Sequence, residues 1–377
     1  MRLARRGQGK SLVLAGGGHA HLAILADLAG ILSRGHSVTV IGPSPYHYYS
    51  GMGPGALGGS YRPEEIRFAI RRIVEKQGGR FLTGEVLRID PEVRTVFMET
   101  GETCAYDVIS FNTGSHVPPT NLTVENTPVI AVKPIENLIR ARQLLSEQLD
   151  RKQLAVGIVG GGPSAAEIAG NVLQLGKSQG KRFSSVRIFS GTRFMDRFPA
   201  EVRKRVETAL TRRGIDLVES GHVSVIENGN VLLDSGRRYP ADIVFLATGV
   251  KPSPIFSRSG LPTGPDGGLI VNRYLQCPAH PDIFGGGDCI HFQEQPLEKV
   301  GVYAVRQNPV LLHNLTAQLD GRELRPFDPG GAYLMIFNLG EGLGVLHKKR
   351  LVFSGRTAFW IKDRIDRGFM KKWKAME

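Results

Sequence analysis

The feature that most constrains this chain is a strand, glycine turn, helix and strand pattern that occurs twice. In the first copy, the apolar run 11–15 ends at Gly16-Gly17-Gly18, a helical pattern of Leu and Ala extends to Ala29, and a second apolar run occupies 37–41. The second copy has a strand at 154–159, glycines at 160–162, a helix from about Ser164 and a strand at 186–189. Such alternation is typical of β-α-β units in a parallel sheet. The repeat therefore predicts an α/β fold with two Rossmann-like domains.

Each unit is also predicted to contain a small antiparallel sheet and a similar closing strand. The antiparallel pairs are 86–89 with 95–98 and 223–226 with 231–233, and the closing strands 106–114 and 241–249 share the order Asp, apolar run, Thr-Gly. Duplication of a whole domain is the simplest explanation. At 377 residues the chain is long enough for two or three packed domains.

The first glycine turn, Gly16-x-Gly18-x-x-His21, has the form of a dinucleotide-binding fingerprint. Its first glycine makes the tight turn, and its second lets a pyrophosphate approach backbone N–H groups at a helix N-terminus. Two positions depart from the pattern. His21 replaces the usual small residue, and Gly42 or Pro43 stands where an acidic residue usually accepts the ribose hydroxyls.

The second turn, Gly160-x-Gly162-x-x-Ala165, matches the fingerprint better because Ala165 is small. The acidic ribose anchor is again missing, and Arg193 follows the next strand, which would favour the 2′-phosphate of NADPH. The alternative is a relic domain whose nucleotide site has decayed. A third signal, the strand at 281–288, ends in Gly287-Asp288 before an expected helix, where Asp288 could accept hydrogen bonds from sugar-alcohol hydroxyls.

Together these motifs resemble the FAD-dependent pyridine nucleotide-disulfide oxidoreductase superfamily over nearly the whole chain. The segments 16–21, 49–55, 302–307 and 360–367 resemble a branch near type II NADH dehydrogenases and sulfide:quinone oxidoreductases, members of which also occur fused to selenophosphate synthetase. The resemblance implies a glutathione-reductase-like fold. It divides the chain into an FAD-binding domain in two parts (1–120 and 251–320), an NAD(P)-binding-like domain (121–250) and a C-terminal α+β segment with a basic amphipathic helix (321–377).

The resemblance also implies which residues contact the cofactors. FAD would be held by Gly16, Gly17, Gly18, His19, Ala20, Thr113, Gly114, Gly287, Asp288 and Ala304. NADH or NADPH would bind at Gly160, Gly162, Pro163, Ser164, Glu167 and Gly249. No catalytic acid or base is assigned, because hydride transfer to a flavin needs none, and no metal site is expected.

Two departures limit the chemistry that the resemblance supports. The three cysteines, Cys104, Cys277 and Cys289, lie far from the positions where a redox-active pair is expected, so dithiol chemistry is disfavoured. Type II NADH dehydrogenases carry an Ala-Gln-x-Ala-x-Gln segment beside flavin and quinone. In this chain 301–307 aligns there, with Ala304 matching and both glutamines changed.

Other polar residues near the expected cofactor have two interpretations each. Lys133, with Pro134, is a candidate flavin neighbour, although a lone loop lysine is more often solvated. His19, His21 and His47 either bond phosphate and move protons or serve in packing, the latter being favoured for His21. Arg306 or Lys299 is a candidate to balance the negative charge of a reduced flavin.

The chain is basic, with a formal net charge of +13 and a pI near 9.8, which favours an anionic partner. Its tail places Ile361, Ile365, Phe369 and Trp373 on one helical stripe, ringed by Lys and Arg. Such a helix either lies in a membrane interface or packs on the protein or a second subunit, so a homodimer stays open. No transmembrane segment or signal peptide is expected. We expect a cytoplasmic protein, with a peripheral position on the inner face of the cytoplasmic membrane as the alternative.

The function predicted from these features is FAD-dependent electron transfer from NAD(P)H to a quinone or similar acceptor. One alternative is a flavoprotein that oxidises a sulfur or selenium compound without NAD(P)H. Another is a redox-inert FAD-binding module. Nucleic acid is not an expected partner, since the basic residues are scattered and no recognised nucleic-acid-binding fold is present.

Overall fold

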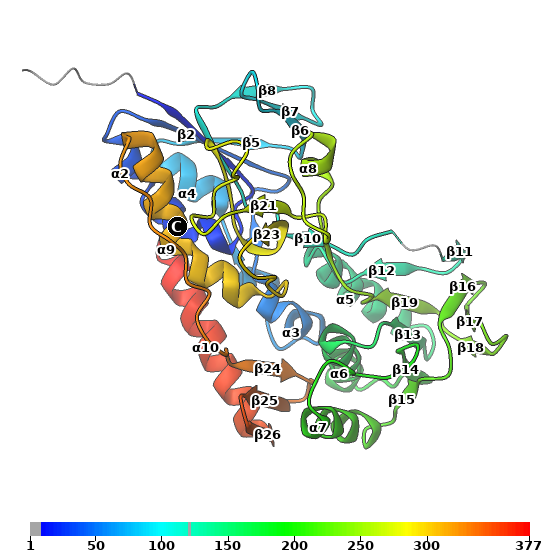
Figure 1. The fold of residues 1–377 in the computed structure, drawn as a ribbon. Helices are drawn as coiled ribbons and strands as arrows, with labels where there is room; N and C mark the ends of the chain where they lie inside the picture. The colour runs from blue at the N-terminus through cyan, green and yellow to red at the C-terminus, as the bar shows by residue number, and fades with distance from the viewer. Residues whose placement is uncertain (1–8, 120–121) are drawn as a thin grey trace, which may run out of the picture.

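The computed structural model describes residues 9–119 and 122–377, and its core consists of two parallel five-stranded sheets (Figure 1). The first has the order β22-β9-β1-β2-β5 and the second β12-β19-β13-β14-β15, so the predicted α/β fold with two Rossmann-like units is confirmed. The strands of the first sheet are β1 (Ser11–Ala15), β2 (Ser37–Gly42), β5 (Arg80–Thr83), β9 (Val108–Phe111) and β22 (Ile283–Gly285). Those of the second are β12 (Val129–Ala131), β13 (Ala155–Val159), β14 (Ser185–Phe189), β15 (Ile215–Val218) and β19 (Ile243–Leu246).

The first sheet is assembled from both halves of the chain. Strand β22 pairs in parallel with β9, with Ile283 opposite Ile109 and Gly285 opposite Phe111. The central strands β1 and β13 are apolar because both faces of each sheet are covered, and their side chains are buried throughout except for Ser11. The late Gly-Asp turn therefore lies beside the two earlier turns of the same sheet.

Helices cover these sheets, and several carry one buried apolar face. The predicted helix after the first glycine turn is two short helices, α1 (Leu22–Ala26) and α2 (Leu28–Leu32), separated at Asp27. The helix after the second turn, α6 (Pro163–Ser178), starts with proline at its first position, where no intrahelical N–H donor is needed. The others are α3 (Gly53–Leu57), α4 (Ile70–Lys76), α5 (Glu136–Leu149), α7 (Ala200–Thr211), α8 (Ile255–Arg258) and α9 (Gly301–Asp320).

Smaller sheets and short turns complete the two domains. The predicted antiparallel pairs are present as β6-β7-β8 and within β11-β16-β17-β18, and three two-stranded pairs, β3-β4, β10-β20 and β21-β23, join loops. Their bounds are β3 (His47–Tyr48), β4 (Arg67–Phe68), β6 (Val86–Asp90), β7 (Thr95–Met98), β8 (Thr103–Ala105), β10 (Ser115–His116), β11 (Thr123–Glu125), β16 (Val223–Glu227), β17 (Asn230–Leu233), β18 (Arg238–Pro240), β20 (Lys251–Pro252), β21 (Leu269–Val271) and β23 (Ile290–Phe292). The 3₁₀ turns are η1 (His19–His21), η2 (Ser50–Met52), η3 (Pro63–Ile66) and η4 (Gly287–Cys289). The helix expected directly after Asp288 is only the turn η4, and the long helix α9 begins at Gly301.

The C-terminal segment is a three-stranded antiparallel sheet, β24 (Met335–Asn338), β25 (Gly344–Lys348) and β26 (Leu351–Gly355), followed by α10 (Arg356–Lys374). In Figure 1, α10 (red) runs along one side of the molecule from this sheet toward the first domain. Its buried residues are Ala358, Lys362, Asp366 and Met370, not the predicted apolar stripe. Among the described residues, none of the helices has the length and apolar character needed to cross a bilayer.

Candidate functional site

Three glycine-containing turns meet at the carboxyl end of the first sheet. They follow β1 (Gly16 to Ala20), β9 (Thr113 and Gly114) and β22 (Gly287 and Asp288), and Ala304 lies opposite them on the first turn of α9. The structure thus brings together all the residues predicted to hold FAD. Carboxyl ends of parallel strands are where open α/β sheets place their ligands.

Asn112, which the sequence reasoning did not select, joins these turns. Its side-chain oxygen accepts the N–H of Ala20 at 3.1 Å, and its amide donates to the Gly286 carbonyl at 2.6 Å. A Cβ on Gly18 would lie 2.0 Å from that same oxygen, and one on Gly287 would lie 2.4 Å from the Asn112 amide nitrogen. The glycines are therefore required by close approach to Asn112, as well as by the ligand they are expected to admit.

His21 has the packing role favoured from sequence. It is fully buried, with Nδ1 2.6 Å from the Gly16 carbonyl and Nε2 2.8 Å from Ser110 Oγ. Burial lowers the pKa of His21 to about 4, so its ring is neutral at pH 7. Because a carbonyl only accepts, Nδ1–H donates to Gly16 and Nε2 accepts from Ser110. The imidazole thus ties the glycine turn to β9.

Four buried polar atoms around these turns have no hydrogen-bond partner among the described residues. They are His19 Nε2, His47 Nε2, Thr113 Oγ1 and Gln307 Nε2. A buried polar group without a partner costs free energy, and such groups in a native structure commonly await a ligand or water. Donors and acceptors around a glycine-lined turn are what a dinucleotide requires, so the residues present fit FAD.

The two histidines without partners are neutral at pH 7. Burial lowers the pKa of His19 to about 4 and that of His47 to about 3, and their rings lie 5.1 Å apart. The Phe369 ring of α10 stacks on the His19 ring with 5.6 Å between ring centroids, and the Tyr49 ring centroid lies 5.2 Å from that of His19. These histidines therefore offer neutral hydrogen-bonding atoms in an aromatic wall, and the C-terminal helix forms part of that wall.

Gln307 is a site residue that the sequence reasoning missed. Its side-chain oxygen accepts the N–H of Gly287 at 2.7 Å, and it is 1% exposed. It lies one helical turn after Ala304 on α9, so both side chains face the Gly287 turn. From the sequence, both family glutamines are expected to be changed in 301–307, yet the last residue of that segment, Gln307, lies in the site. Helical spacing from Ala304 was the available signal.

Lys133, expected more often to be solvated, forms an ion pair inside the site. Its Nζ lies 2.9 Å from Asp288 Oδ2 and 2.9 Å from Ser115 Oγ, and the Ser115 hydroxyl donates to the same carboxylate at 2.7 Å. Burial alone would raise the pKa of Asp288, but the Lys133 charge and these two hydrogen bonds outweigh it and hold the pKa below its ordinary value. Asp288 is therefore a carboxylate at neutral pH.

The second glycine turn lies at the carboxyl end of the second sheet, and Gly249 follows β19 at the same edge. Gly160 has φ +139°, and a Cβ there would lie 2.2 Å from the Ala247 carbonyl oxygen. By contrast, a Cβ on Gly162 would meet nothing within 4 Å. Ser164 and Arg193 are exposed beside this turn, so its mouth is open to solvent.

The sequence predicts that Glu167 belongs to the nucleotide turn, but its carboxylate is directed toward the C-terminal segment. Oε1 accepts the N–H of Asn338 in β24 at 2.8 Å. Burial raises the pKa of Glu167 to about 7, with the Lys362 charge opposing the rise. A carboxyl group that titrates near neutrality is suited to proton exchange.

A buried charged network on α10 adjoins Glu167. Lys362 Nζ lies 2.5 Å from Asp366 Oδ2 and donates to the Gly51 carbonyl at 2.7 Å, while the Tyr49 hydroxyl donates to Asp366 Oδ1 at 2.9 Å. The side chains of Lys362 and Asp366 are only 10% and 5% exposed. Burial raises the pKa of Asp366, and the Lys362 charge offsets part of that rise. Lys362, one of the basic residues expected to ring the C-terminal helix, is therefore internal.

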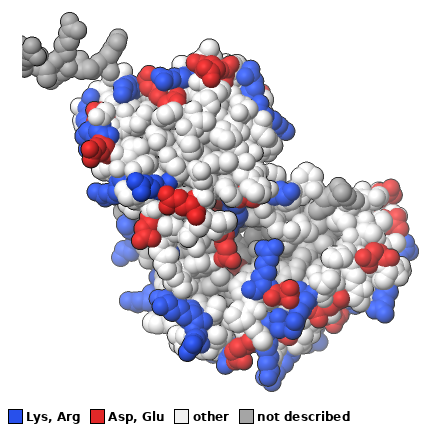
Figure 2. Space-filling view, in the orientation of Figure 1, with Lys and Arg blue, Asp and Glu red and all other residues white. Residues whose placement is uncertain are grey.

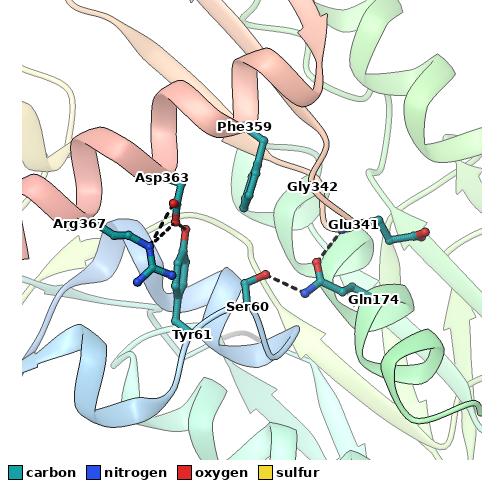
Figure 3. Close-up of a pocket in the computed structure, with 8 residues that line it drawn as sticks. All are labelled: Ser60, Tyr61, Gln174, Glu341, Gly342, Phe359, Asp363 and Arg367. Atoms are coloured by element: carbon teal, nitrogen blue, oxygen red, sulfur yellow. Dashed lines mark hydrogen bonds and ion pairs between the residues drawn. The ribbon is translucent and has the colours of Figure 1, made fainter.

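A cavity of about 360 Å³ opens between α6 and α10, and Figure 3 shows the residues that line it. Phe359, Tyr61 and Arg367 flank it, and Gln174 donates to Ser60 at 2.7 Å along its wall. The Tyr61 hydroxyl donates to Asp363 at 2.8 Å, and Asp363 is adjacent in sequence to Lys362. The cavity thus lies between α6 and the face of α10 that carries Asp363 and Arg367, which directly follow Lys362 and Asp366 in the sequence.

The other candidates from sequence are engaged elsewhere. Arg306 donates to the carbonyls of Pro329 and Gly331, and Lys299 lies 2.7 Å from Asp266. All three cysteines are free thiols, and burial raises the pKa of Cys289, which disfavours its reactive thiolate.

Comparison with known proteins decides the family. Residues 10–314 match the family model described as pyridine nucleotide-disulphide oxidoreductase. This chain belongs to that family. The match spans both glycine turns and the Asp288 turn, as the resemblance from sequence implied.

Relatives in this family include proteins that are named as quinone reductases. The chain is 27% identical to demethylphylloquinone reductase NdbB of Synechocystis sp., over 78% of each chain. It is 25% identical to the type II NADH:quinone oxidoreductase of Staphylococcus saprophyticus, over 95% of this chain and 94% of that one. It is also 27% identical to ferroptosis suppressor protein 1 of Taeniopygia guttata, over 79% of each.

Solved structures share the fold. The sulfide:quinone oxidoreductase of Aquifex aeolicus superposes with a TM-score of 0.78 at 19% identity, covering 98% of this chain and 92% of that one. NDH2 of Plasmodium falciparum, solved with NADH, superposes with a TM-score of 0.78 at 14% identity, covering 96% of this chain and 97% of that one.

Proposed function

We propose that the protein is an FAD-dependent oxidoreductase that passes electrons from NADH or NADPH to a quinone. The observation that carries this proposal is the arrangement of the glycine turns. At the edge of the first sheet, three glycine turns lie together with four polar atoms that have no hydrogen-bond partner among the described residues, and at the second sheet the glycine turn is open to solvent. The edge of the first sheet fits a dinucleotide that stays bound, and the open turn of the second sheet fits a dinucleotide that binds and leaves. The names of the relatives favour a quinone over other acceptors.

We propose that backbone N–H groups of Gly16 to Ala20 bind the FAD pyrophosphate and that Asp288 accepts from the ribityl hydroxyls. Thr113, Gly114, Gly287 and Ala304 would complete the cradle, and His19 Nε2 and Gln307 Nε2 would gain the partners they lack. When bound, FAD supplies the two-electron chemistry that protein side chains lack. The protein residues orient it and exclude water.

The nucleotide donor would bind at the second turn. Gly160 and Gly162 let the backbone approach its pyrophosphate, Pro163 and Ser164 begin the helix whose N-terminus favours negative charge, and Gly249 lies at the same edge. The exposed guanidinium of Arg193, at the end of the neighbouring strand, would pair with a 2′-phosphate.

The acceptor would approach through the cavity between α6 and α10. Reduction of a quinone to a quinol takes up two protons, and Glu167 is suited to supply one because its pKa is about 7. The Lys362 ammonium donates to Asp366 and to the Gly51 carbonyl, and its third N–H would donate a hydrogen bond to the acceptor oxygen. Under this proposal Glu167 is assigned to the acceptor, whereas the sequence groups it with the nucleotide donor.

The proposal is tested by anaerobic titration of the FAD-loaded protein with NADH and NADPH, followed by a soluble quinone. Loss of the oxidised-flavin absorbance on adding the donor, and its return on adding quinone, is expected. Flavin that stays oxidised with both donors would refute the NAD(P)H half, and flavin that is reduced but not reoxidised would refute the quinone half.

We further propose that the C-terminal segment contacts an anionic membrane surface, where quinones reside. Trp360, Ile365 and Leu351 are 59%, 49% and 57% exposed. Exposed basic residues occur close to them in sequence, at the hairpin tip and on α10: Lys348, Lys349, Arg350, Arg356 and Arg364. Figure 2 shows Lys and Arg side chains along this lower part of the molecule. Amphipathic surfaces of this kind bind membrane interfaces.

This contact is tested by flotation with vesicles containing anionic phospholipid. Binding that falls at high salt, and that is lost in a W360S/I365S/L351S variant, is expected. Absence of binding by the wild-type protein would refute the membrane contact without affecting the electron-transfer proposal.

A further inference from the structure

The Lys133–Asp288 pair joins the two domains at the expected position of the flavin. Lys133 follows β12 at the carboxyl end of the second sheet, whereas Asp288 belongs to the turn after β22 of the first. The side chains are 24% and 13% exposed. Their charges act on His19 in opposite directions, Asp288 raising its pKa and Lys133 lowering it, so both lie near the unpartnered His19 ring.

Other positive charges near this cradle are neutralised or absent at pH 7. His19, His21 and His47 are neutral because burial lowers the pKa of each to about 4 or below. Lys299, whose charge also lowers the pKa of Asp288, is paired with Asp266, and Lys362 is paired with Asp366. Removal of Lys133 would therefore leave the Asp288 carboxylate without the cation that contacts it.

We propose that Lys133 sets the reduction potential of the bound FAD by cancelling the charge of Asp288. This inference uses the FAD site of the proposed function but not its donor or acceptor. NAD(P)H delivers a hydride, two electrons and one proton, and leaves as NAD(P)⁺, so the reduced cofactor carries one additional negative charge. Like charge within a few ångströms disfavours an anionic form. A neutral Lys133–Asp288 pair removes that penalty while Asp288 keeps its acceptor oxygens for the cofactor.

The same physics gives the expected size of the effect. A nearby unit charge shifts ionisation equilibria by about one to two units, which is a factor of about 10 to 100. In K133Q we expect the ratio of reduced to oxidised FAD, at a fixed solution potential, to fall by about 10- to 100-fold, where tenfold is about 30 mV for a two-electron couple. K133R, which keeps the charge, should stay within about threefold of wild type.

The experiment is dye-equilibrated anaerobic reduction of the FAD-loaded protein by an enzymatic electron source. Since the electrons come from neither NAD(P)H nor quinol, the potential is measurable even where the proposed donor and acceptor fail to react. K152Q is the matched control, because Lys152 pairs with Asp242 at the opposite end of the second sheet and is 60% exposed.

A rescue variant separates charge from structure. In K133Q/D288N both charges are removed, so the pair is again neutral and the potential should return toward the wild-type value. A merely structural role for Lys133 predicts no rescue. Two results would overturn the proposal. One is a K133Q variant that binds FAD and whose ratio of reduced to oxidised FAD is within about threefold of wild type. The other is a K133Q/D288N variant whose potential is as low as that of K133Q. If K133Q does not retain FAD, the potential of K133Q/D288N is compared with that of D288N. The D288N variant keeps the Lys133 charge without the Asp288 charge, so the FAD potential of D288N should be the higher of the two.

Discussion

Replacement of Lys362 by Met is the perturbation whose consequence the structure defines most fully. The change keeps most of the side-chain volume but removes the ammonium that contacts Asp366 at 2.5 Å and the Gly51 carbonyl at 2.7 Å. Asp366, only 5% exposed, then keeps one hydrogen bond, from Tyr49. Removal of one partner of a buried ion pair costs about 3 to 5 kcal/mol. We therefore expect K362M to be less stable than wild type by about 3 kcal/mol at pH 8, a factor of about 100 in the unfolding equilibrium.

The deficit should depend on pH with a definite sign. Burial already raises the pKa of Asp366, and loss of the Lys362 charge raises it further. A carboxyl group whose folded pKa lies above its unfolded value is most stabilising when protonated, and that stability is lost as pH rises through the folded pKa. The deficit of K362M relative to wild type should thus be full at pH 8 and smaller at pH 5.

Urea unfolding followed by tryptophan fluorescence suits this test, because the two tryptophans of the chain, Trp360 and Trp373, both lie on α10. The control is K362M/D366N, which removes both charges and should recover most of the loss. The reasoning would be refuted if K362M were as stable as this double variant at pH 8. It would also be refuted if the loss of unfolding free energy in K362M, relative to wild type, grew toward pH 5.

Three further outcomes are expected. Gly18→Ala should weaken FAD binding by more than about tenfold, because its Cβ would lie 2.0 Å from Asn112 Oδ1. Gly162→Ala should retain full FAD content, and flavin absorbance after dialysis measures both variants. The rate of quinone reduction, measured with pre-reduced protein, should fall as pH rises through about 7 as Glu167 loses its proton, and E167Q should show no such transition. R193A should lower kcat/KM for NADPH by about 10-fold or more and leave that for NADH nearly unchanged; equal losses for both donors would contradict a role in 2′-phosphate recognition.

Much of the fold was predictable because its signals are local. The apolar runs of β1 and β13, the glycines that follow them and the helical spacing after each occur within short windows, so period and turn chemistry identify both units. The break of the first helix at Asp27 and the single turn after Asp288 were not predictable in this way. At the first break the Gln77 side chain accepts the Ala29 N–H and donates to the Leu25 carbonyl, the two groups that a continuous helix would pair. After Asp288 the chain passes directly from η4 into strand β23.

The sequence by itself determined the two dinucleotide-binding units, the glycine turns and the membership of the oxidoreductase family. Only the tertiary structure decided which polar side chains work together. Lys133 meets Asp288, Asn112 joins three turns, and Glu167 turns from the nucleotide edge toward Lys362 on α10. Each of these contacts spans many residues of chain, and its geometry depends on how the two domains and the C-terminal helix pack. A local pattern determines the strand and the turn, whereas a buried charge finds its partner only after the chain has folded.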